Sequence, residues 1–483
     1  MAAVCIVPLV MWVVAAPLGP RFAGTAQSLT SVGTLLALAG VSSFALNLVL
    51  GGRIRLLESA FGGLDKLYGV HRINGRVAFL LLLSHGVAMA AAQVAAAGAT
   101  GLRFLLPTGG NWSVTFGLIA LVLMAVTIGL TLYAHLGHET FVYVQRFFGF
   151  VFCVAALHVF LVPGTKSISR PLTIYLSTLF LLGAGAWIYR SLLGERLVPR
   201  RSYVIDSVTA VGHDVIEVAM APRDERSTGR SRQKGNERSA WRSRQKGNER
   251  STRRSRQKGN GSLSFTPGQF VYVTFESEAM RRSFRPFWIH AEGDFGVVSV
   301  RPGEVANQYH PFSITSGPAE RDLRVVVKAV GDYTRAMANL EPGAGVRVEG
   351  PYGSFSYLNV NNLRQVWIAG GIGLTPFLSM ARSLSSGDHE IDFYYCMEDG
   401  HQGYFLDELY DIADRVPRLR VAPIRRDRLG FVSASDIAGL TPGLSVKDIL
   451  ICGPPAMIDV LEHQFIELGV PRRRIHFEKF GFV

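Results

Sequence analysis

The sequence predicts a multi-domain membrane protein: a six-helix transmembrane bundle, then a small antiparallel β-barrel, then an α/β domain with a parallel sheet. The first part of the 483-residue chain, up to about residue 190, is far more apolar than the rest. From Tyr203 onward, short β-branched runs alternate with Gly and Pro, as in a small barrel. After residue 356, strand-like and helix-like segments alternate, which is typical of a parallel sheet. We therefore expect domains over residues 1–195, 200–356 and 357–483.

Six apolar stretches are candidates to cross the hydrocarbon layer, which takes about 20 residues. The first has no basic segment before it and apolar segments after it, so we expect a spanning helix and not a signal peptide. With both termini in the cytoplasm, ten basic residues fall on the inner side and four on the outer side, which favours this orientation in the plasma membrane. The stretches are residues 3–19, 28–50, 77–97, 112–134, 147–163 and 171–189. The inner residues are Arg53, Arg55, Lys66, Arg72, Arg76, Arg146, Arg190, Arg196, Arg200 and Arg201, and the outer ones are Arg21, Arg103, Lys166 and Arg170.

The net charge of +13 is concentrated in one insert. Between Arg223 and Lys258, 14 Arg or Lys stand against 4 Asp or Glu, which accounts for +10 and leaves +3 for the rest of the chain. A 12-residue repeat, RSRQKGNERSAW, starts at Arg230, and so polar a segment cannot bury enough apolar surface to fold. We interpret residues 223–261 as a disordered insert in a barrel hairpin, or alternatively as an anchor to anionic lipid. The charge therefore does not indicate nucleic-acid binding.

Two histidines lie inside apolar helices, where an ionisable side chain is costly and by default indicates function. They are His85 and His158, and His71 precedes His85 by 14 residues, about 3.9 helical turns, so the two share one helix face. Neutral imidazole is a standard axial ligand of haem iron. The alternative is a histidine hydrogen-bonded to a neighbouring helix. We also expect Gly75 and Gly149, at matched positions of two helices, to leave room for a flat macrocycle.

The segment LDKLYGVHRINGRVAFLLLLSHG resembles the third helix of the ferric reductase and NADPH oxidase superfamily. The resemblance implies that His71 faces an inner haem b and that His85 and His158 hold the iron of an outer one. Gln145 stands where the superfamily has its second inner ligand, and glutamine is a poor ligand for iron. The sequence therefore leaves open whether the protein holds one haem or two. The inner haem is absent, five-coordinate, or bound by His135 or His138.

A second set of motifs resembles the FAD-binding domain of the ferredoxin-reductase-like family. In HPFSIT, Ser313 is implied to hydrogen-bond the isoalloxazine edge, and His310 to contact the phosphate or ribityl side of FAD. Backbone N–H groups and the guanidinium of Arg335 are implied to bind the FAD phosphate, which the planar fork of arginine matches. The alternative for each of these stretches, taken alone, is an ordinary strand or turn of the barrel. The full candidate set is His310, Pro311, Phe312, Ser313, Ile314, Thr315, Lys328, Gly331, Tyr333, Thr334 and Arg335.

A glycine-rich turn follows a hydrophobic strand at GGIGLTP, and such a turn presents backbone N–H groups to a pyrophosphate. The family resemblance places Cys452 beside the nicotinamide where hydride leaves for the flavin, although a small buried residue at a strand end is the simpler interpretation. Arg425 and Arg426 are implied to meet the 2′-phosphate, which favours NADPH over NADH; a solvated charge pair is the alternative. Phe480 or Phe482 is implied to stack on the flavin and move aside for nicotinamide. The nucleotide-binding set is Gly370, Gly371, Gly373, Thr375, Pro376, Arg425, Arg426, Cys452, Gly453 and Pro454.

Together these motifs predict an enzyme that moves electrons from cytoplasmic NAD(P)H through FAD and b-type haem to an acceptor outside the membrane. Oxygen is the favoured acceptor, which makes the protein a superoxide-forming oxidase, and a ferric or cupric chelate is the alternative. An alternative of another class is a flavin reductase whose helices form only an anchor or a transport module without haem. The expected partners are the lipid bilayer and a small-molecule acceptor, with no nucleic acid.

Overall fold

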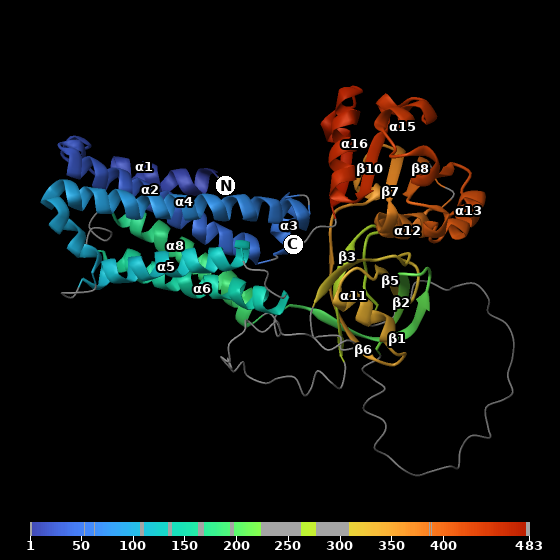
Figure 1. The fold of residues 1–483 in the computed structure, drawn as a ribbon, viewed down its shortest axis with the longest axis horizontal. Helices are drawn as coiled ribbons and strands as arrows, with labels where there is room; N and C mark the ends of the chain where they lie inside the picture. The colour runs from blue at the N-terminus through green and yellow to red at the C-terminus, as the bar shows by residue number, and fades with distance from the viewer. Residues whose placement is uncertain are drawn as a thin grey trace, which may run out of the picture. The chain divides into compact units, whose positions relative to one another are not determined.

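The computed structural model describes residues 2–52, 54–61, 63–106, 111–133, 138–162, 169–193, 198–223, 262–276, 309–385, 387 and 389–479. The chain forms two compact units, Met1–Val198 and Pro199–Val483 (Figure 1). The basic repeats, His135, Phe480 and Phe482 lie outside the described residues, and so do Arg53, Lys166 and Arg196.

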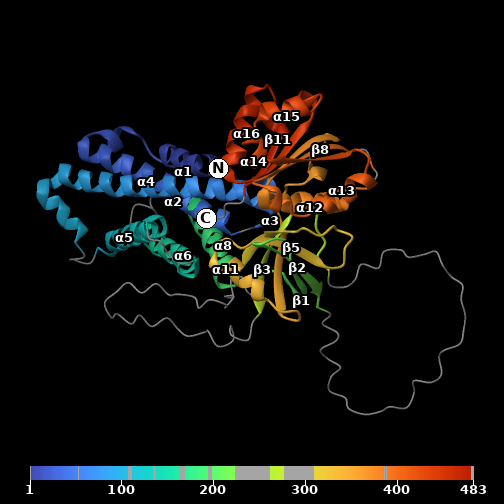
Figure 2. The ribbon, with the colours of Figure 1, turned by 45° about the vertical axis from the view of Figure 1, so that its right-hand side comes forward.

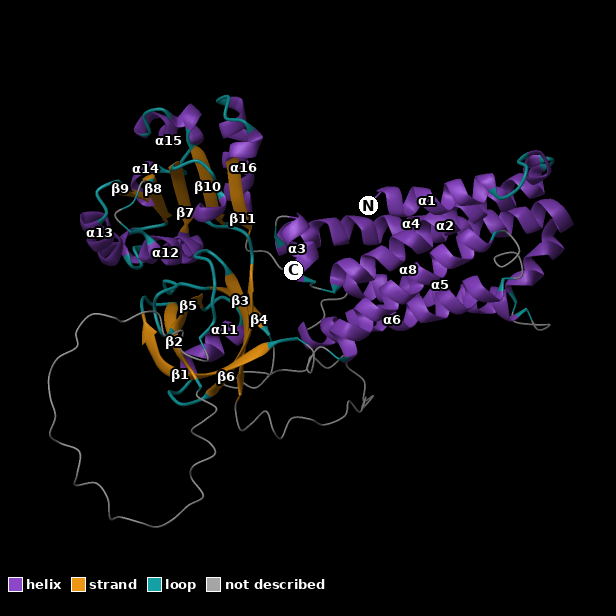
Figure 3. Ribbon diagram, turned by 180° about the vertical axis from the view of Figure 1, so that it is seen from behind, coloured by secondary structure: helices purple, strands orange, loops and turns teal. Residues whose placement is uncertain are grey.

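The first unit is a bundle of helices that lie side by side (Figures 1 and 3). Five helical segments are long and apolar enough to span a membrane, and α1, also apolar, is shorter at 13 residues. α1 ends three residues before Pro17, consistent with the bias of proline and the residue before it against the α conformation. Among the described residues the helices are α1 (Ala2–Val14), α2 (Thr25–Gly51), α3 (Arg55–Phe61), α4 (Leu64–Ala97), α5 (Trp112–Tyr133), α6 (His138–Leu161) and α8 (Arg170–Trp187).

A buried polar seam joins α2 to α4 inside the bundle. The Asn74 side-chain amide donates to the carbonyl of Ser43 (2.8 Å) and to Oδ1 of Asn47 (3.2 Å), and Ser43 Oγ donates back to Asn74 Oδ1 (2.8 Å). Interhelical hydrogen bonds of this kind are a main source of helix pairing in membranes, where the hydrophobic effect no longer acts between helices. The seam fixes the register of α4, the helix that carries His71 and His85.

The second unit begins with a six-stranded antiparallel sheet in the order β4–β3–β6–β1–β2–β5. Its edge strands are joined by a bridge between Ile314 and Val325. β2 and β3, which flank the basic insert, are not neighbours in this order, so the predicted hairpin is wrong and the insert lies in a crossover connection. The strands are β1 (Arg200–Ala210), β2 (Val215–Pro222), β3 (Phe270–Glu276), β4 (His310–Ser313), β5 (Leu323–Lys328) and β6 (Gly345–Tyr352), and the short helix α11 (Asp332–Ala336) follows β5.

The chain continues into a five-stranded parallel sheet in the order β11–β10–β7–β8–β9, with helices on both faces (Figure 2). The central strands β7, β8 and β10 are buried almost throughout, as parallel strands usually are. The order reverses between β7 and β10, and ligands of open α/β sheets bind at such a switch point, at the carboxyl ends of the strands. The elements are β7 (Arg364–Gly370), α12 (Leu374–Ser383), β8 (Glu390–Met397), α13 (Leu406–Arg415), β9 (Leu419–Arg425), α14 (Arg426–Leu429), α15 (Ala434–Leu440), β10 (Asp448–Gly453), α16 (Pro455–Glu467) and β11 (Ile475–Lys479).

Candidate functional site

The glycine-rich turn and the Cys452 turn lie against each other at the switch point. Gly373 has no room for a side chain, because a Cβ there would overlap the carbonyl of Cys452. A Cβ on Gly453 would lie 3.1 Å from the Cα of Gly370. Gly371 has a φ of 53°, in the left-handed region that favours glycine. Two motifs that are far apart in the sequence are therefore in backbone contact.

Helix α12 begins at Leu374, directly after the glycine-rich turn. Thr375 Oγ1 donates to the carbonyl of Ile372 (3.1 Å), and Pro376 is buried in the first helical turn. The first N–H groups of a helix have no partner within the helix, and its dipole favours an anion at this end. The turn and the start of α12 therefore suit a pyrophosphate.

Cys452 is fully buried, and β10 places it between Ala369 of β7 and Glu478 of β11. Burial, with a smaller contribution from the Glu478 charge, raises the pKa of the thiol well above its ordinary value. Cys452 is therefore a neutral thiol at physiological pH and not a nucleophile. Glu478 is itself buried, and it belongs to none of the motifs found in the sequence. No signal in the sequence reveals it, because its place beside Cys452 depends on the pairing of β11 with β10.

β4 carries the candidate flavin residues, with Ser313 opposite Phe270 of β3. The hydroxyls of Ser313 and Thr315 are buried and have no hydrogen-bond partner within the described part of the chain. A buried hydroxyl without a partner costs about 1–3 kcal/mol. Two such hydroxyls, one at the end of β4 and one just after it, fit a bound group with a polar edge, such as an isoalloxazine ring.

His310 lies over Tyr333, with the ring centroids 3.7 Å apart and the planes inclined by 32°. Burial raises the pKa of Tyr333. Pro311 and Phe312 of β4 are half-buried, and Ile314, directly after the strand, is fully buried at its bridge to β5. β4 thus exposes only part of the rings of His310, Pro311 and Phe312 to a ligand.

The loop before α11 folds onto itself. Thr334 Oγ1 accepts from the backbone N–H groups of Val330 and Gly331, each at 3.0 Å, and Arg335 donates to the carbonyl of Val330 (2.9 Å). The N–H of Gly331, one of the candidate FAD-binding residues, is thus bonded to Thr334 within the protein. Lys328, at the end of β5, is paired with Asp214 in the turn between β1 and β2, 3.4 Å away.

Arg425 and Arg426 lie where β9 ends and α14 begins, on the nucleotide side of the sheet. Each is already paired with a carboxylate: Arg425 makes two hydrogen bonds to Asp427 (3.1 and 2.6 Å), and Arg426 lies 2.5 Å from Glu398. A 2′-phosphate at this position would compete with these carboxylates.

In the helical unit the structure brings His85 and His158 together, with ring centroids 6.2 Å apart. Nδ1 of His85 lies 2.8 Å from the carbonyl of Gly33, and Nδ1 of His158 lies 2.6 Å from the carbonyl of Ser113. A carbonyl can only accept, so each Nδ1 carries the proton and each Nε2 keeps its lone pair, as in metal-ligating histidines. A Cβ on Gly117 would clash with the His158 ring, so this glycine makes room for the imidazole.

The ring separation fits the sharing of one metal. The two imidazoles would hold one metal ion through their Nε2 atoms, since metal–nitrogen bonds of about 2 Å are compatible with ring centroids 6.2 Å apart. The residues present therefore fit a haem held by His85 and His158. Backbone carbonyls already orient both imidazoles toward this role.

The candidate residues of the inner haem differ in arrangement from the His85–His158 pair. Nδ1 of His71 lies 3.1 Å from the carbonyl of Asn47, whereas Gln145 is exposed. The expectation that Gly75 and Gly149 leave room for a macrocycle is wrong. A Cβ on Gly75 would lie 3.0 Å from the Asn47 amide, and one on Gly149 would overlap the indole of Trp187. These glycines instead allow helices to pack closely.

Three family models match the chain in order. They are the ferric reductase like transmembrane component over residues 36–156, the FAD-binding domain over 278–356, and the oxidoreductase NAD-binding domain over 367–463.

Two curated relatives illustrate the match. Flavohemoprotein A of Dictyostelium discoideum is 23% identical over 38% of this chain and 50% of its own length. The ferredoxin–NAD(P)+ reductase component of the naphthalene 1,2-dioxygenase/salicylate 5-hydroxylase systems of Ralstonia sp is 28% identical over 45% of this chain and 61% of its own length. The chain thus spans between half and about three fifths of these relatives. Among solved structures, the flavohem-like FAD/NAD binding domain of nitric oxide dioxygenase from Vibrio cholerae O1 biovar El Tor is 18% identical, covers 58% of this chain and 98% of its own, and has a TM-score of 0.41.

The sheets, their paired turns and the apolar helices define a multi-pass membrane oxidoreductase with FAD and NAD(P)H electron-transfer modules. More particularly, the chain has the domain architecture of the ferric reductase and NADPH oxidase superfamily. This confirms the resemblance that the sequence predicts.

Proposed function

We propose that this protein moves electrons from cytoplasmic NAD(P)H, through FAD and b-type haem, to an acceptor on the outer side of the plasma membrane, with oxygen as the favoured acceptor. The observation that carries the proposal is the His85–His158 pair, whose rings lie 6.2 Å apart with each Nδ1 on a backbone carbonyl. That geometry leaves two Nε2 lone pairs inside an apolar bundle, where an unused imidazole is costly.

We propose functional domains over residues 1–195, 200–356 and 357–483, with the six-stranded sheet closed as a barrel by the Ile314–Val325 bridge. Bound FAD and haem would together supply the change from two-electron hydride chemistry to one-electron transfer. His85 and His158 would hold the haem. The buried hydroxyls of Ser313 and Thr315 would bond the edge of the flavin.

The nucleotide site would work mainly by positioning. The glycine-rich turn and the start of α12 would bind the pyrophosphate, and the backbone contact between Gly373 and Cys452 would fix the distance to the hydride-transfer site. Cys452, as a neutral thiol, would line this site without carrying charge. Glu478 would present a carboxylate at the same place.

The test uses the purified full chain in liposomes, with NADPH on the side of the flavin domain. We expect superoxide-dismutase-sensitive reduction of cytochrome c on the opposite side. His158→Ala should abolish this signal while NADPH still reduces the flavin. Reduction of a ferric chelate without superoxide would instead assign the chelate as acceptor. Full activity of the His158→Ala variant would mean that electrons do not cross by the proposed route.

A further inference from the structure

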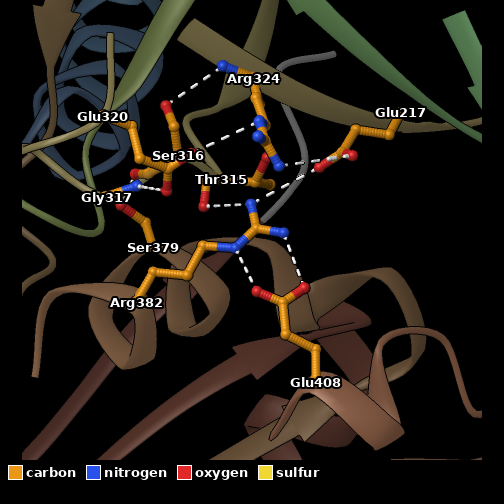
Figure 4. A network of polar contacts seen from close by, with 9 residues as sticks. All are labelled: Glu217, Thr315, Ser316, Gly317, Glu320, Arg324, Ser379, Arg382 and Glu408. Carbon is orange, nitrogen blue, oxygen red and sulfur yellow. Dashed lines mark hydrogen bonds and ion pairs between the residues drawn. The ribbon is translucent and has the colours of Figure 1, made fainter. Parts of the chain in front are cut away.

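One face of α12 contacts the flavin domain. Arg382, in the last turn of this helix, is 7% exposed. Its Nε and Nη2 donate to the two carboxylate oxygens of Glu408 on α13, at 2.7 and 2.8 Å, in a forked pair (Figure 4). Its remaining nitrogen, Nη1, donates to the carbonyl of Thr315 in the flavin domain (2.9 Å). Arg382 therefore uses every side-chain nitrogen, and one of them crosses between the domains.

A second bond on the same face repeats the link. Ser379 lies one turn before Arg382, and its Oγ donates to the carbonyl of Ser316 (2.8 Å) in a fully buried contact. Residues three apart lie on the same side of a helix. α12 thus holds two successive carbonyls of the segment that follows β4 (Figure 4).

The segment that follows β4, which α12 contacts, is also hydrogen-bonded within the flavin domain. The Thr315 N–H donates to the carbonyl of Arg324, and the Arg324 N–H donates to Ser316 Oγ (3.1 Å). Arg324 and Arg382 both lie within 4.0 Å of Glu217 on β2. The same segment carries the buried hydroxyl of Thr315, and Ser313 lies two residues earlier.

α12 therefore has a different task at each end. Its start follows the turn that contacts Cys452, and its last turn bonds the segment after β4, beside the unpartnered hydroxyls. We propose that Arg382 is a positioning residue that sets the place of the flavin strand relative to the nicotinamide site. This inference rests on the proposed transfer of hydride from NAD(P)H to FAD.

The forked geometry makes the role specific to arginine. Lysine at the same position keeps the charge, but as a single point donor it cannot hold Glu408 and Thr315 together in this fork. Because a displacement of about 1 Å between reacting groups lowers a rate by roughly a hundredfold, a small slip of this segment should be visible in hydride transfer.

The experiment is anaerobic stopped-flow reduction of the flavin by NADPH in the full-length protein. For Arg382→Gln we expect the limiting rate to fall by about tenfold to a hundredfold, with flavin content and the NADPH concentration for half-saturation unchanged. The charge-transfer absorption of stacked nicotinamide and flavin should weaken. Arg382→Lys should give an intermediate rate.

The matched control is Arg420→Gln, which removes a guanidinium whose partner, Asp392 at 2.7 Å, lies within the nucleotide domain. It should reduce flavin at the wild-type rate. If Arg382→Gln does not fold, Ser379→Ala removes the parallel link, and it should slow reduction with flavin content unchanged.

The role of Arg382 would be overturned, with the proposed function intact, if Arg382→Gln kept the wild-type rate and charge-transfer band. If Arg382→Gln does not fold, the same result in Ser379→Ala would overturn it. An equal loss in Arg420→Gln would also overturn it, because the effect would then be general destabilisation. If NADPH and NADH fail to reduce the flavin of the wild-type protein, the proposed function and this inference fail together.

Discussion

Gly373→Ala is a direct test of the contact between the two nucleotide-binding turns. The added Cβ would overlap the carbonyl of Cys452 and lie 2.8 Å from the Cα of Gly453. Both neighbours are backbone atoms, so no flexible side chain can move aside. Carbon and carbonyl oxygen normally approach no closer than about 3.3 Å, so the turns must part by roughly 1 Å.

A displacement of this size lowers a rate that depends on alignment by about a hundredfold, or about 2.7 kcal/mol of activation free energy. The assay is the limiting rate of flavin reduction by NADPH, measured together with the melting temperature. The control is Gly439→Ala on α15, where a Cβ meets nothing within 4 Å. That variant should keep the wild-type rate and change stability by no more than about 1 kcal/mol. If Gly373→Ala reduced flavin as fast as the wild-type protein, the close contact would have no part in hydride transfer.

Two further predictions concern charge at the nucleotide site. Glu398→Gln removes the carboxylate that is paired with Arg426, so the ratio of kcat/KM for NADPH to that for NADH should rise by roughly threefold, a modest change because the pair is half-exposed. The control, Glu467→Gln at an exposed position, should leave this ratio unchanged. A fall in the ratio for Glu398→Gln would refute the assignment of Arg426 to the 2′-phosphate. Because burial raises the pKa of the Cys452 thiol, iodoacetamide should alkylate Cys452 in the native protein far more slowly than in the denatured protein, even at about pH 8.5, where an ordinary thiol is half ionised. Rapid native labelling at Cys452, read by mass spectrometry, would show that the thiol is neither buried nor neutral.

The order of domains and the type of each sheet could be predicted from the sequence because they depend on local periodicity. Alternating β-branched runs indicate an antiparallel sheet, and strands separated by helices indicate a parallel one. Strand order is not local. The insert was assigned to a hairpin because β2 and β3 are consecutive in the chain, yet β3 pairs with β4 and β6.

The candidate site could be predicted where the residue types of a motif themselves indicate what it binds. GGIGLTP and the intramembrane histidines are of this kind, and the structure places His85 beside His158. Glu478 was missed because a single acidic residue in a terminal strand resembles a solvated position until its register with Cys452 is known. Gly149 was misinterpreted because the sequence does not say which side chain, here that of Trp187, fills the space beside a glycine.

The most direct test of the account is the reduced-minus-oxidised difference spectrum of the purified full chain, with the haem-to-protein ratio measured on the same sample. The account predicts b-type Soret and α bands that are lost in both His85→Ala and His158→Ala. A flavin-loaded, folded preparation without any bound porphyrin would contradict it, and so would bands that survive both substitutions.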